Sequence, residues 1–344
     1  MLKNIAVVVI FIKLAIIVVN TALNCREEIG LRKDMENIIE NISKVVVGKK
    51  LVILDILEAI LAEGHVLIED VPGVGKTMLV KALSKSLNLN FSRIQLTPDI
   101  LPSDILGVSV YNPRNYEFNF KKGPIFANMV LVDEINRALP RTQSALIEVM
   151  EEGQITDGNN TYLLDAPFMV MATENPLEYS GTFQLPEAVL DRFMIKISLG
   201  YPTKNEEIKM LSSRSVHGKS QLDSILPVME LDQLKQHQEQ VGNVHVSSGI
   251  YEFIVNIVQK TRSCNELLLG ASPRASIALL KISKAAAYVH GRNYVVPDDV
   301  KENIKKVLSH RIILSKEEKF NGTDTSKIID NIMKEVAVPD VKYA

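Results

Sequence analysis

Hydrophobic residues along this chain fall into short runs separated by longer segments with a helical period. Five runs of four to six residues, at 65–68, 91–96, 129–132, 168–172 and 193–197, are rich in apolar residues. Such runs are typical of strands buried on both faces of a parallel sheet. Helical patterns, for example at 78–86 and 140–152, separate them. The alternation predicts an α/β domain built on a doubly wound parallel sheet.

Two segments depart from this alternation. Apolar and polar residues alternate along 107–122 around a central turn, and Tyr116, Phe118 and Phe120 share one face. The segment 153–164 repeats the pattern around a turn of its own. Alternation with a period of two on both sides of a turn indicates a β-hairpin. We therefore expect two hairpins inserted into the α/β domain.

Helices dominate on both sides of the strand region. A helix, a loop and a second helix are expected within 34–64. Beyond Pro202 we expect helices only, at 204–213, 249–261, 273–290 and 297–309. These changes divide the chain into a hydrophobic extension at 1–27, an α/β domain at 28–200, a small all-α lid domain at 201–335 and a tail at 336–344.

The segment between the first predicted strand and the next helix has the composition of a phosphate-binding loop. Residues 72–75, Pro-Gly-Val-Gly, form a turn, and Lys76 and Thr77 begin a helical pattern. Backbone N–H groups and the helix dipole make such a junction an anion site. Lys76 can reach the β- and γ-phosphates of a nucleotide, and the Thr77 hydroxyl can ligate Mg²⁺.

Other interpretations of this loop are weaker. The generic motif has glycine where Asp70 stands, but that position precedes the tight turn, and 72–77 is intact. A dinucleotide-binding G-x-G-x-x-G motif would need a third glycine in place of Met78. A chance Gly-Lys-Thr turn is not expected between a strand and a helix.

Two acidic residues follow the apolar run at 129–132. Asp133 and Glu134 begin 57 positions after Lys76. A P-loop enzyme needs a carboxylate at a neighbouring strand end to hold Mg²⁺, and Asp133 fits that role. Glu134 is then placed to orient and deprotonate an attacking water. The alternative is a strand that ends in solvated acids, and the P-loop at this spacing argues against it.

Three further polar residues are candidates for contact with phosphate. Asn175 follows the run at 168–172 and could position water against the γ-phosphate, although Asn-Pro is also an ordinary turn. Arg192 directly precedes the last predicted strand. Most arginines are simply solvated, so this residue alone is a weak candidate. Arg274 occupies the second position of a helix capped by Ser272. A cation there opposes the helix dipole, and a phosphate partner would explain it.

An apolar run also occupies 5–19, interrupted by Lys13, and its fifteen residues fall short of the about 20 that a membrane-spanning helix needs. Its length suits a signal peptide, but the residues before Cys25 make a poor cleavage site. Three interpretations stay open: an extension outside the folded body or a misassigned start, a membrane anchor, and a packed helix. We expect a cytoplasmic protein with membrane association available through 5–19.

Composition and charge limit the classes of molecule that the protein is expected to bind. The 344 residues carry a net charge of −2, and no dense block of Lys and Arg indicates a nucleic-acid surface. Cys25 and Cys264 are the only cysteines, so neither a disulfide framework nor a zinc site is indicated. We therefore expect no nucleic acid as a partner.

The motifs PGVGKT, LVDEINRA, ATENP, LPEAVLDRF and GASPRA, in this order and spacing, resemble those of MoxR-type AAA+ ATPases. The resemblance covers about 28–313, and the first 27 residues have no counterpart in the family. It implies an ATPase that uses ATP and Mg²⁺, with Walker A at 72–77 and Walker B at Asp133 and Glu134. It makes the hairpins the helix-2 insert and the pre-sensor 1 insert, and 46–48 an adenine contact.

The resemblance also implies a role for each candidate residue. Asn175 becomes sensor 1, Arg192 the arginine finger that acts on a neighbouring subunit's nucleotide, and Arg274 sensor 2. The expected catalytic residues are Glu134, Asp133, Lys76, Asn175, Arg192 and Arg274. The expected nucleotide contacts are Val47, Pro72, Gly73, Val74, Gly75, Lys76, Thr77 and Met78. The expected magnesium ligands are Thr77 and Asp133.

The function implied by the resemblance is a chaperone that remodels or matures protein complexes, including the insertion of metal cofactors. The expected partners are further copies of the chain in a ring, most simply a hexamer, and a client protein such as one with a von Willebrand factor A domain.

Two alternative functions belong to other classes of protein. A DNA-remodelling motor or clamp-loader-like binder is disfavoured by the near-neutral charge, because the first hairpin offers only Arg114, Lys121 and Lys122 and the second offers no basic residue. A nucleotide-gated scaffold without turnover is disfavoured by Glu134, which a simple binder does not need.

Overall fold

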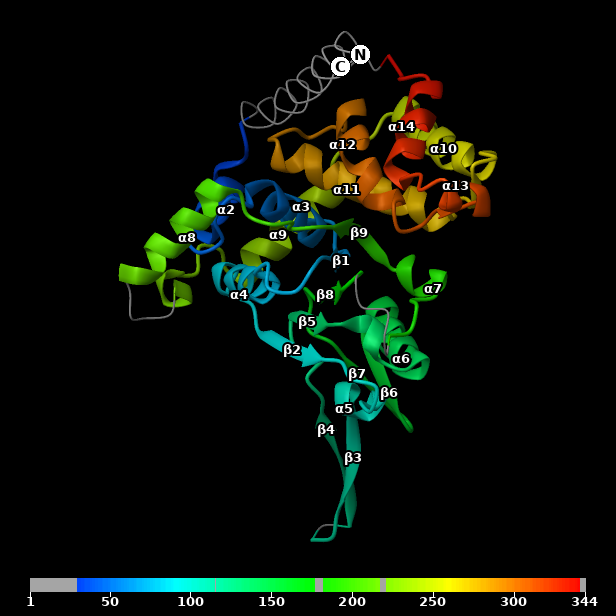
Figure 1. The fold of residues 1–344 in the computed structure, drawn as a ribbon. Coiled ribbons are helices and arrows are strands. Elements are labelled where there is room, and N and C mark those ends of the chain that lie inside the picture. The colour runs from blue at the N-terminus through cyan, green and yellow to red at the C-terminus, as the bar shows by residue number, and fades with distance from the viewer. Residues whose placement is uncertain (1–29, 115, 177–181, 217–220, 341–344) are drawn as a thin grey trace.

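Residues 30–114, 116–176, 182–216 and 221–340 are described by the computed structural model of the protein, which Figure 1 draws as a ribbon. Five parallel strands form its centre: β1 (His65–Glu69), β2 (Phe91–Gln95), β5 (Met129–Asp133), β8 (Met169–Glu174) and β9 (Phe193–Ile197). Their order in the sheet is β2-β5-β8-β1-β9. The five apolar runs are thereby confirmed as parallel strands, to within one or two residues at their ends.

The two faces of the sheet belong to two different cores. The helices that cover them are α3 (Lys50–Leu61), α4 (Lys76–Ser86), α6 (Pro140–Glu152) and α7 (Glu187–Leu190). Met129 and Leu131 pack with α3 and α4, whereas Val130 and Val132 pack with α6 and α7. Successive side chains alternate because Cβ atoms along a strand point to opposite faces. Figure 1 shows α4 and α6 on opposite sides of the sheet, so the doubly wound α/β prediction is confirmed.

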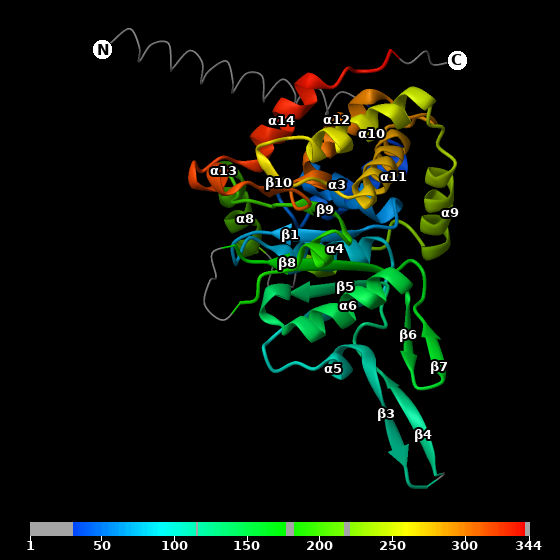
Figure 2. The ribbon, with the colours of Figure 1, turned by 90° about the vertical axis from the view of Figure 1, so that its right-hand side faces the viewer.

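Both predicted hairpins are confirmed as antiparallel pairs inserted into this domain. Their strands are β3 (Gly107–Asn112), β4 (Glu117–Lys122), β6 (Gln154–Asp157) and β7 (Asn160–Leu163). The rings of Phe120 and Tyr162 stack with their centroids 4.1 Å apart, and Ser109 donates a hydrogen bond to Asp157. The base of the β3–β4 hairpin therefore packs along the β6–β7 hairpin, while the rest of β3–β4 extends away from the body of the molecule (Figures 1 and 2).

A helical lid follows β9. Its helices are α8 (Lys204–Val216), α9 (Leu231–Gly242), α10 (Ser248–Arg262), α11 (Pro273–Val289), α12 (Pro297–Leu308), α13 (Lys316–Phe320) and α14 (Thr325–Glu335). The lid is helical, as the sequence predicts, and one short antiparallel pair joins it, β10 (Leu267–Leu269) with β11 (Ile313–Leu314). Strands of three and two residues are too short to leave a periodic pattern in the sequence.

The lid packs against β9, the outermost strand on one side of the sheet. Buried Arg311 donates hydrogen bonds to the carbonyl oxygens of Met194 at 3.0 Å and Phe193 at 2.7 Å. The core beneath α3 and α4 also continues into the lid, because Ile53 of α3 and Leu279 of α11 are fully buried in the same cluster. The sheet and the lid therefore share one hydrophobic core.

The expected location needs a correction. The sequence suggested a cytoplasmic protein with membrane association available through 5–19. Among the residues that the structure describes, however, no helix is both long and apolar enough to cross a bilayer. That finding overturns the location predicted from the sequence, and we withdraw it. The run at 5–19 and the rest of the extension at 1–27 lie outside the described residues.

Candidate active site

The P-loop edge of the sheet is the edge where the five parallel strands end. Asp70 follows β1, Asp133 ends β5 and Asn175 follows β8. These three strands are direct neighbours in the order β5-β8-β1. In open α/β sheets, ligands bind outside the carboxyl ends of the strands. The fold therefore brings the sequence-predicted site residues Asp133 and Asn175 to one edge, together with Asp70.

The loop after β1 leaves open space on its inner side. Gly73 and Gly75 have φ angles of +86° and +96°, and a Cβ atom added to either would meet nothing within 4 Å. The α4 helix begins directly afterwards at Lys76, and within the described part of the chain no side chain caps its N-terminus. Its first N–H groups therefore remain available to an anion. The residues present fit the phosphates of a nucleotide.

Lys76 lies back across this loop. Its ammonium donates a hydrogen bond to the Asp70 carbonyl oxygen at 2.8 Å. Partial burial lowers the pKa of Lys76, while the charges of Asp70, Asp133 and Glu134 act in the opposite direction. The structure thus brings Lys76 within the electrostatic reach of both predicted acids. Thr77 follows in the first turn of α4.

Asp133 is held on two sides. Arg93 of β2 donates from Nε to Oδ2 at 2.6 Å, and the Thr173 hydroxyl of β8 donates to Oδ1 at 3.3 Å. The carboxylate is nine-tenths buried, whereas its partner Arg93 is about half exposed. These contacts fix a charged oxygen ligand at the end of β5, at the P-loop edge. Such an oxygen could coordinate a hard cation.

Glu134 adopts a left-handed backbone conformation, with φ +58° and ψ +54°. A residue other than glycine held there costs about 1–3 kcal/mol, which the surrounding contacts must offset. Its N–H donates to the Thr173 hydroxyl at 3.0 Å. Its carboxylate accepts from Gln95 at 2.8 Å and forms an ion pair with Arg137 at 3.0 Å. The backbone turn thus directs the Glu134 carboxylate toward Gln95, at the end of the neighbouring strand.

Asp70, the residue that departs from the generic motif, connects the P-loop to the exit from β9. Its carboxylate accepts hydrogen bonds from the N–H groups of Leu199 at 2.6 Å and Gly200 at 2.8 Å. Lys49 donates to the Gly200 carbonyl oxygen at 3.2 Å from the other side. The loop that contains Val47 is therefore tied to the P-loop through Gly200, on the side where the resemblance predicts adenine.

The arginine edge is the opposite edge, where the strands begin. His65, the first residue of β1, bonds through Nε2 to the Met150 carbonyl oxygen at 3.0 Å, which places the end of α6 beside the start of β1. Glu151 follows Met150, and its carboxylate accepts from Arg192 at 2.7 Å and also from Arg274. In Figure 2, β5 points toward one end of the sheet, and the β6–β7 hairpin that follows α6 lies at the other.

The structure therefore divides the predicted catalytic residues into two groups. Lys76, Asp133, Glu134 and Asn175 lie at the P-loop edge, whereas Arg192 and Arg274 meet at Glu151 on the arginine edge. A strand of five residues spans about 16 Å, so the two groups are separated by roughly the height of the sheet.

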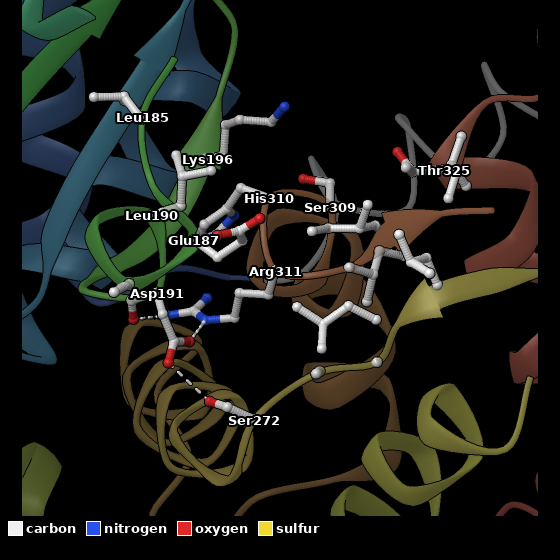
Figure 3. A pocket seen from close by; sticks show the side chains of 18 of the residues that line it. Leu185, Glu187, Leu190, Asp191, Lys196, Ser272, Ser309, His310, Arg311 and Thr325 are labelled. Atoms are coloured by element: carbon white, nitrogen blue, oxygen red, sulfur yellow. Dashed lines mark hydrogen bonds and ion pairs between the residues drawn. The ribbon is translucent and has the colours of Figure 1, made fainter. Parts of the chain in front are cut away.

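Asp191 joins the lid to the strand region beside this cluster. Its carboxylate accepts hydrogen bonds from the Ser272 hydroxyl at 2.8 Å and from Arg311 Nε at 2.9 Å, as Figure 3 shows. All three residues line a cavity of about 1010 Å³ between α7, β9 and the lid. Since Ser272 caps α11 and Arg274 follows it, the same contact also sets the position of Arg274.

Sequence reasoning missed Arg93, Gln95, Glu151 and Asp191. Each of them fits the local pattern of a strand or a helix, so the sequence gives no reason to assign it a function. The acidic or basic residue that it contacts at the site is at least 39 residues away in the chain. Their roles therefore depend on contacts that no local signal encodes.

Comparison with known proteins agrees with this architecture. The family model described as the ATPase family associated with various cellular activities (AAA) matches residues 65–195, and an AAA lid domain model matches 259–332. Chaperone MoxR1 of Mycobacterium tuberculosis is 38% identical over 316 residues, 89% of this chain and 83% of that protein. The chain belongs to the MoxR family of AAA ATPases.

Two further relatives extend over the same region. YeaC of Bacillus subtilis, itself uncharacterized, is 50% identical over 302 residues, 88% of this chain and 93% of that protein. A crystal structure from Cytophaga hutchinsonii, assigned as an ATPase, superposes with a TM-score of 0.83 at 40% identity and covers 89% of this chain and 95% of that one. Membership in the family and this structural relative support nucleotide binding and ATPase activity.

Proposed function

We propose that this MoxR-family protein is a Mg²⁺-dependent ATP hydrolase that works as a ring and uses hydrolysis to remodel a client protein complex. The P-loop would hold the phosphates of ATP, with Lys76 against the β- and γ-phosphates. Thr77 and Asp133 would hold Mg²⁺, which neutralises charge on the phosphates. Glu134 would take a proton from the attacking water, and Asn175 would orient that water.

One observation carries the proposal of a ring. Arg192 and Arg274 lie together at Glu151, at the opposite edge of the sheet from Lys76. Neither arginine can therefore reach a phosphate bound in the P-loop of its own subunit. A second copy that presents its P-loop edge to this arginine edge would complete the site. Contacts between two different edges close into a ring when the rotation between subunits allows it, and we propose a hexamer.

The β3–β4 hairpin is the surface that we propose for the client. Val110, Tyr111, Tyr116 and Phe118 are all exposed on it, and Phe118 is 71% exposed. Exposed apolar groups gathered on one projecting element are typical of protein interaction sites. A relative of this chain is described as a chaperone. The client would be a protein complex awaiting maturation or a metal cofactor, such as one that contains a von Willebrand factor A domain.

The Glu134→Gln variant tests this proposal directly. The amide keeps the shape of the side chain but cannot accept the proton of the attacking water. We expect ATP to bind with an affinity close to that of the parent protein, and kcat to fall about 100-fold or more. The measurements are phosphate release and binding of a fluorescent ATP analogue, each with and without Mg²⁺.

A matched control is Glu148→Gln, which removes the same charge from an exposed position on α6. Its phosphate release should equal that of the parent. Hydrolysis by Glu134→Gln at the parental rate would show that Glu134 is not the general base. The slow variant should also retain clients, so affinity capture with it in the presence of ATP should recover a partner that is lost when the hairpin change Phe118→Ser is added.

A further inference from the structure

Glu151 is an exposed residue near the end of α6 that binds two arginines from different parts of the fold. Arg192 comes from the residue just before β9, and Arg274 from the first turn of α11 in the lid. The two arginines are 82 positions apart in the chain, and Glu151 is the point at which they meet.

The geometry gives each carboxylate oxygen to one arginine. Oε2 of Glu151 accepts from Arg192 Nη2 at 2.7 Å and from Nε at 3.2 Å, and Oε1 accepts from Arg274 Nη2. Arg192 Nη1 also donates to the Ala188 carbonyl oxygen at 2.6 Å. A planar guanidinium held by three hydrogen bonds from two sides has a fixed orientation. Arg274 keeps most of its five N–H donors for another acceptor.

Stability alone does not account for this cluster. The side chain of Arg192 is 23% exposed, that of Arg274 44% and that of Glu151 40%. Ion pairs as exposed as these contribute little to the free energy of unfolding. Without the carboxylate, however, two like charges would lie side by side and repel each other, and each long side chain would sample many rotamers. What the carboxylate provides is therefore placement of the two cations.

We propose that Glu151 is a positioning residue that gathers Arg192 and Arg274 into a single two-arginine unit, which engages the ATP phosphates of the neighbouring subunit. This inference rests on the proposed function of the arginine edge. Because the arginines are ordered before they meet the phosphate, less conformational freedom is lost as the transition state forms. Arg274 is carried by α11, so the same carboxylate also links the position of the lid to the position of Arg192.

The test compares Glu151→Ala and Glu151→Gln with the parent and with the control Glu148→Gln, all as the full chain. We measure kcat and KM for ATP, binding of a fluorescent ATP analogue, assembly by light scattering and thermal melting. For Glu151→Ala we expect kcat to fall about tenfold while KM stays within about twofold, since ground-state binding at the P-loop edge is untouched. Glu151→Gln keeps a single acceptor oxygen, and its loss should be smaller.

A double-mutant cycle separates positioning from a general structural effect. If Glu151 acts through the arginines, Glu151→Ala should lower kcat less in an Arg274→Ala background than in the parent. An equal loss in both backgrounds, or a parallel drop in melting temperature, would overturn the proposal in favour of a structural role. An increase in kcat would overturn it as well, because the carboxylate would then compete with phosphate for the arginines.

The same series distinguishes this inference from the proposed function. If the parent hydrolyses ATP, Arg192→Ala does not, and Glu151→Ala equals the parent, the proposed function stands and the role of Glu151 is wrong. If Arg192→Ala hydrolyses ATP like the parent, the arginine edge has no part in the reaction. Both proposals about that edge then fail together.

Discussion

The two edges of the central sheet carry functional side chains in different ways. At the P-loop edge, Asp133 lies at a strand end with its carboxylate nine-tenths buried, held by hydrogen bonds from neighbouring strands. At the arginine edge, Arg192 and Arg274 lie at helix ends, partly exposed, and share one carboxylate. The first edge is thus organised by contacts within the subunit, whereas the second is more exposed and is the one that we propose meets another subunit.

The consequence is that the two edges should fail differently when they are altered. A change at the P-loop edge should affect the subunit that carries it, because substrate binding depends on that subunit alone. A change at the arginine edge should affect the adjacent subunit instead. This distinction can be measured with single variants and with mixtures of variants.

The largest effect is expected for Lys76→Ala. The change removes the charged donor that we propose faces the β- and γ-phosphates, and ATP affinity should then fall about 100-fold. Binding of a fluorescent ATP analogue measures it, with Lys81→Ala as the control on the same helix. If Lys76→Ala binds ATP like the parent protein, the assignment of nucleotide binding to this edge is wrong.

A mixture of Arg192→Ala and Glu134→Gln subunits should recover activity that neither variant has alone. An interface between the intact Arg192 of one subunit and the intact Glu134 of another is complete. With random assembly at equal amounts, about a quarter of the interfaces are of this kind, so phosphate release should approach a quarter of the parental rate.

Co-assembly of the two variants is checked first, with different affinity tags on each. Verified mixed rings that stay inactive would mean that Arg192 acts within its own subunit or is structural. The arginine edge would then not act on a neighbouring subunit, although Arg192 and Arg274 still meet at Glu151.

The smallest effect is expected for Asp70→Asn. The carboxylate now accepts from the N–H groups of Leu199 and Gly200 on one oxygen and from that of Val71 on the other. The new amide has only one acceptor oxygen, so its NH2 group would face N–H donors on one of these two sides. Loss of such buried hydrogen bonds should cost about 1–3 kcal/mol of stability and lower the melting temperature by about 2–5 °C. The exposed pair partner Asp298 supplies the control, Asp298→Asn, which should melt like the parent. An unchanged melting temperature for Asp70→Asn would show that the β9 exit does not depend on this carboxylate.

Much of the P-loop edge can be predicted from the sequence because its signals are local. The Gly-rich turn between a strand and a helix, and the acids after a buried strand, are each visible within ten residues. The arginine edge gives no such signal. Glu151 is one of two consecutive acids at the end of a helix, and its partners Arg192 and Arg274 are 41 and 123 residues away. Local reasoning finds that Arg274 suits a phosphate, but it does not indicate which subunit provides that phosphate.

The backbone conformation of a single residue also cannot be predicted from the local sequence. Nothing in the sequence around Glu134 favours a left-handed backbone, since glutamate is not a residue that adopts it readily. The conformation is set by contacts with Thr173 and Gln95 on neighbouring strands. The role of Asp70 is comparable, because a motif shows which residue replaces glycine but not what the replacement contacts.

The shared core of the sheet and the lid has a mechanical consequence. Ile53 and Leu279 are fully buried where α3 packs against α11, so swinging the lid away would expose both to water. Each large aliphatic side chain exposed in this way costs about 1.5–3 kcal/mol. Rotation of whole subunits about their mutual contact leaves this core intact. We therefore expect the force generated by hydrolysis to be transmitted by movement of entire subunits against each other, with each lid travelling as part of its own rigid body.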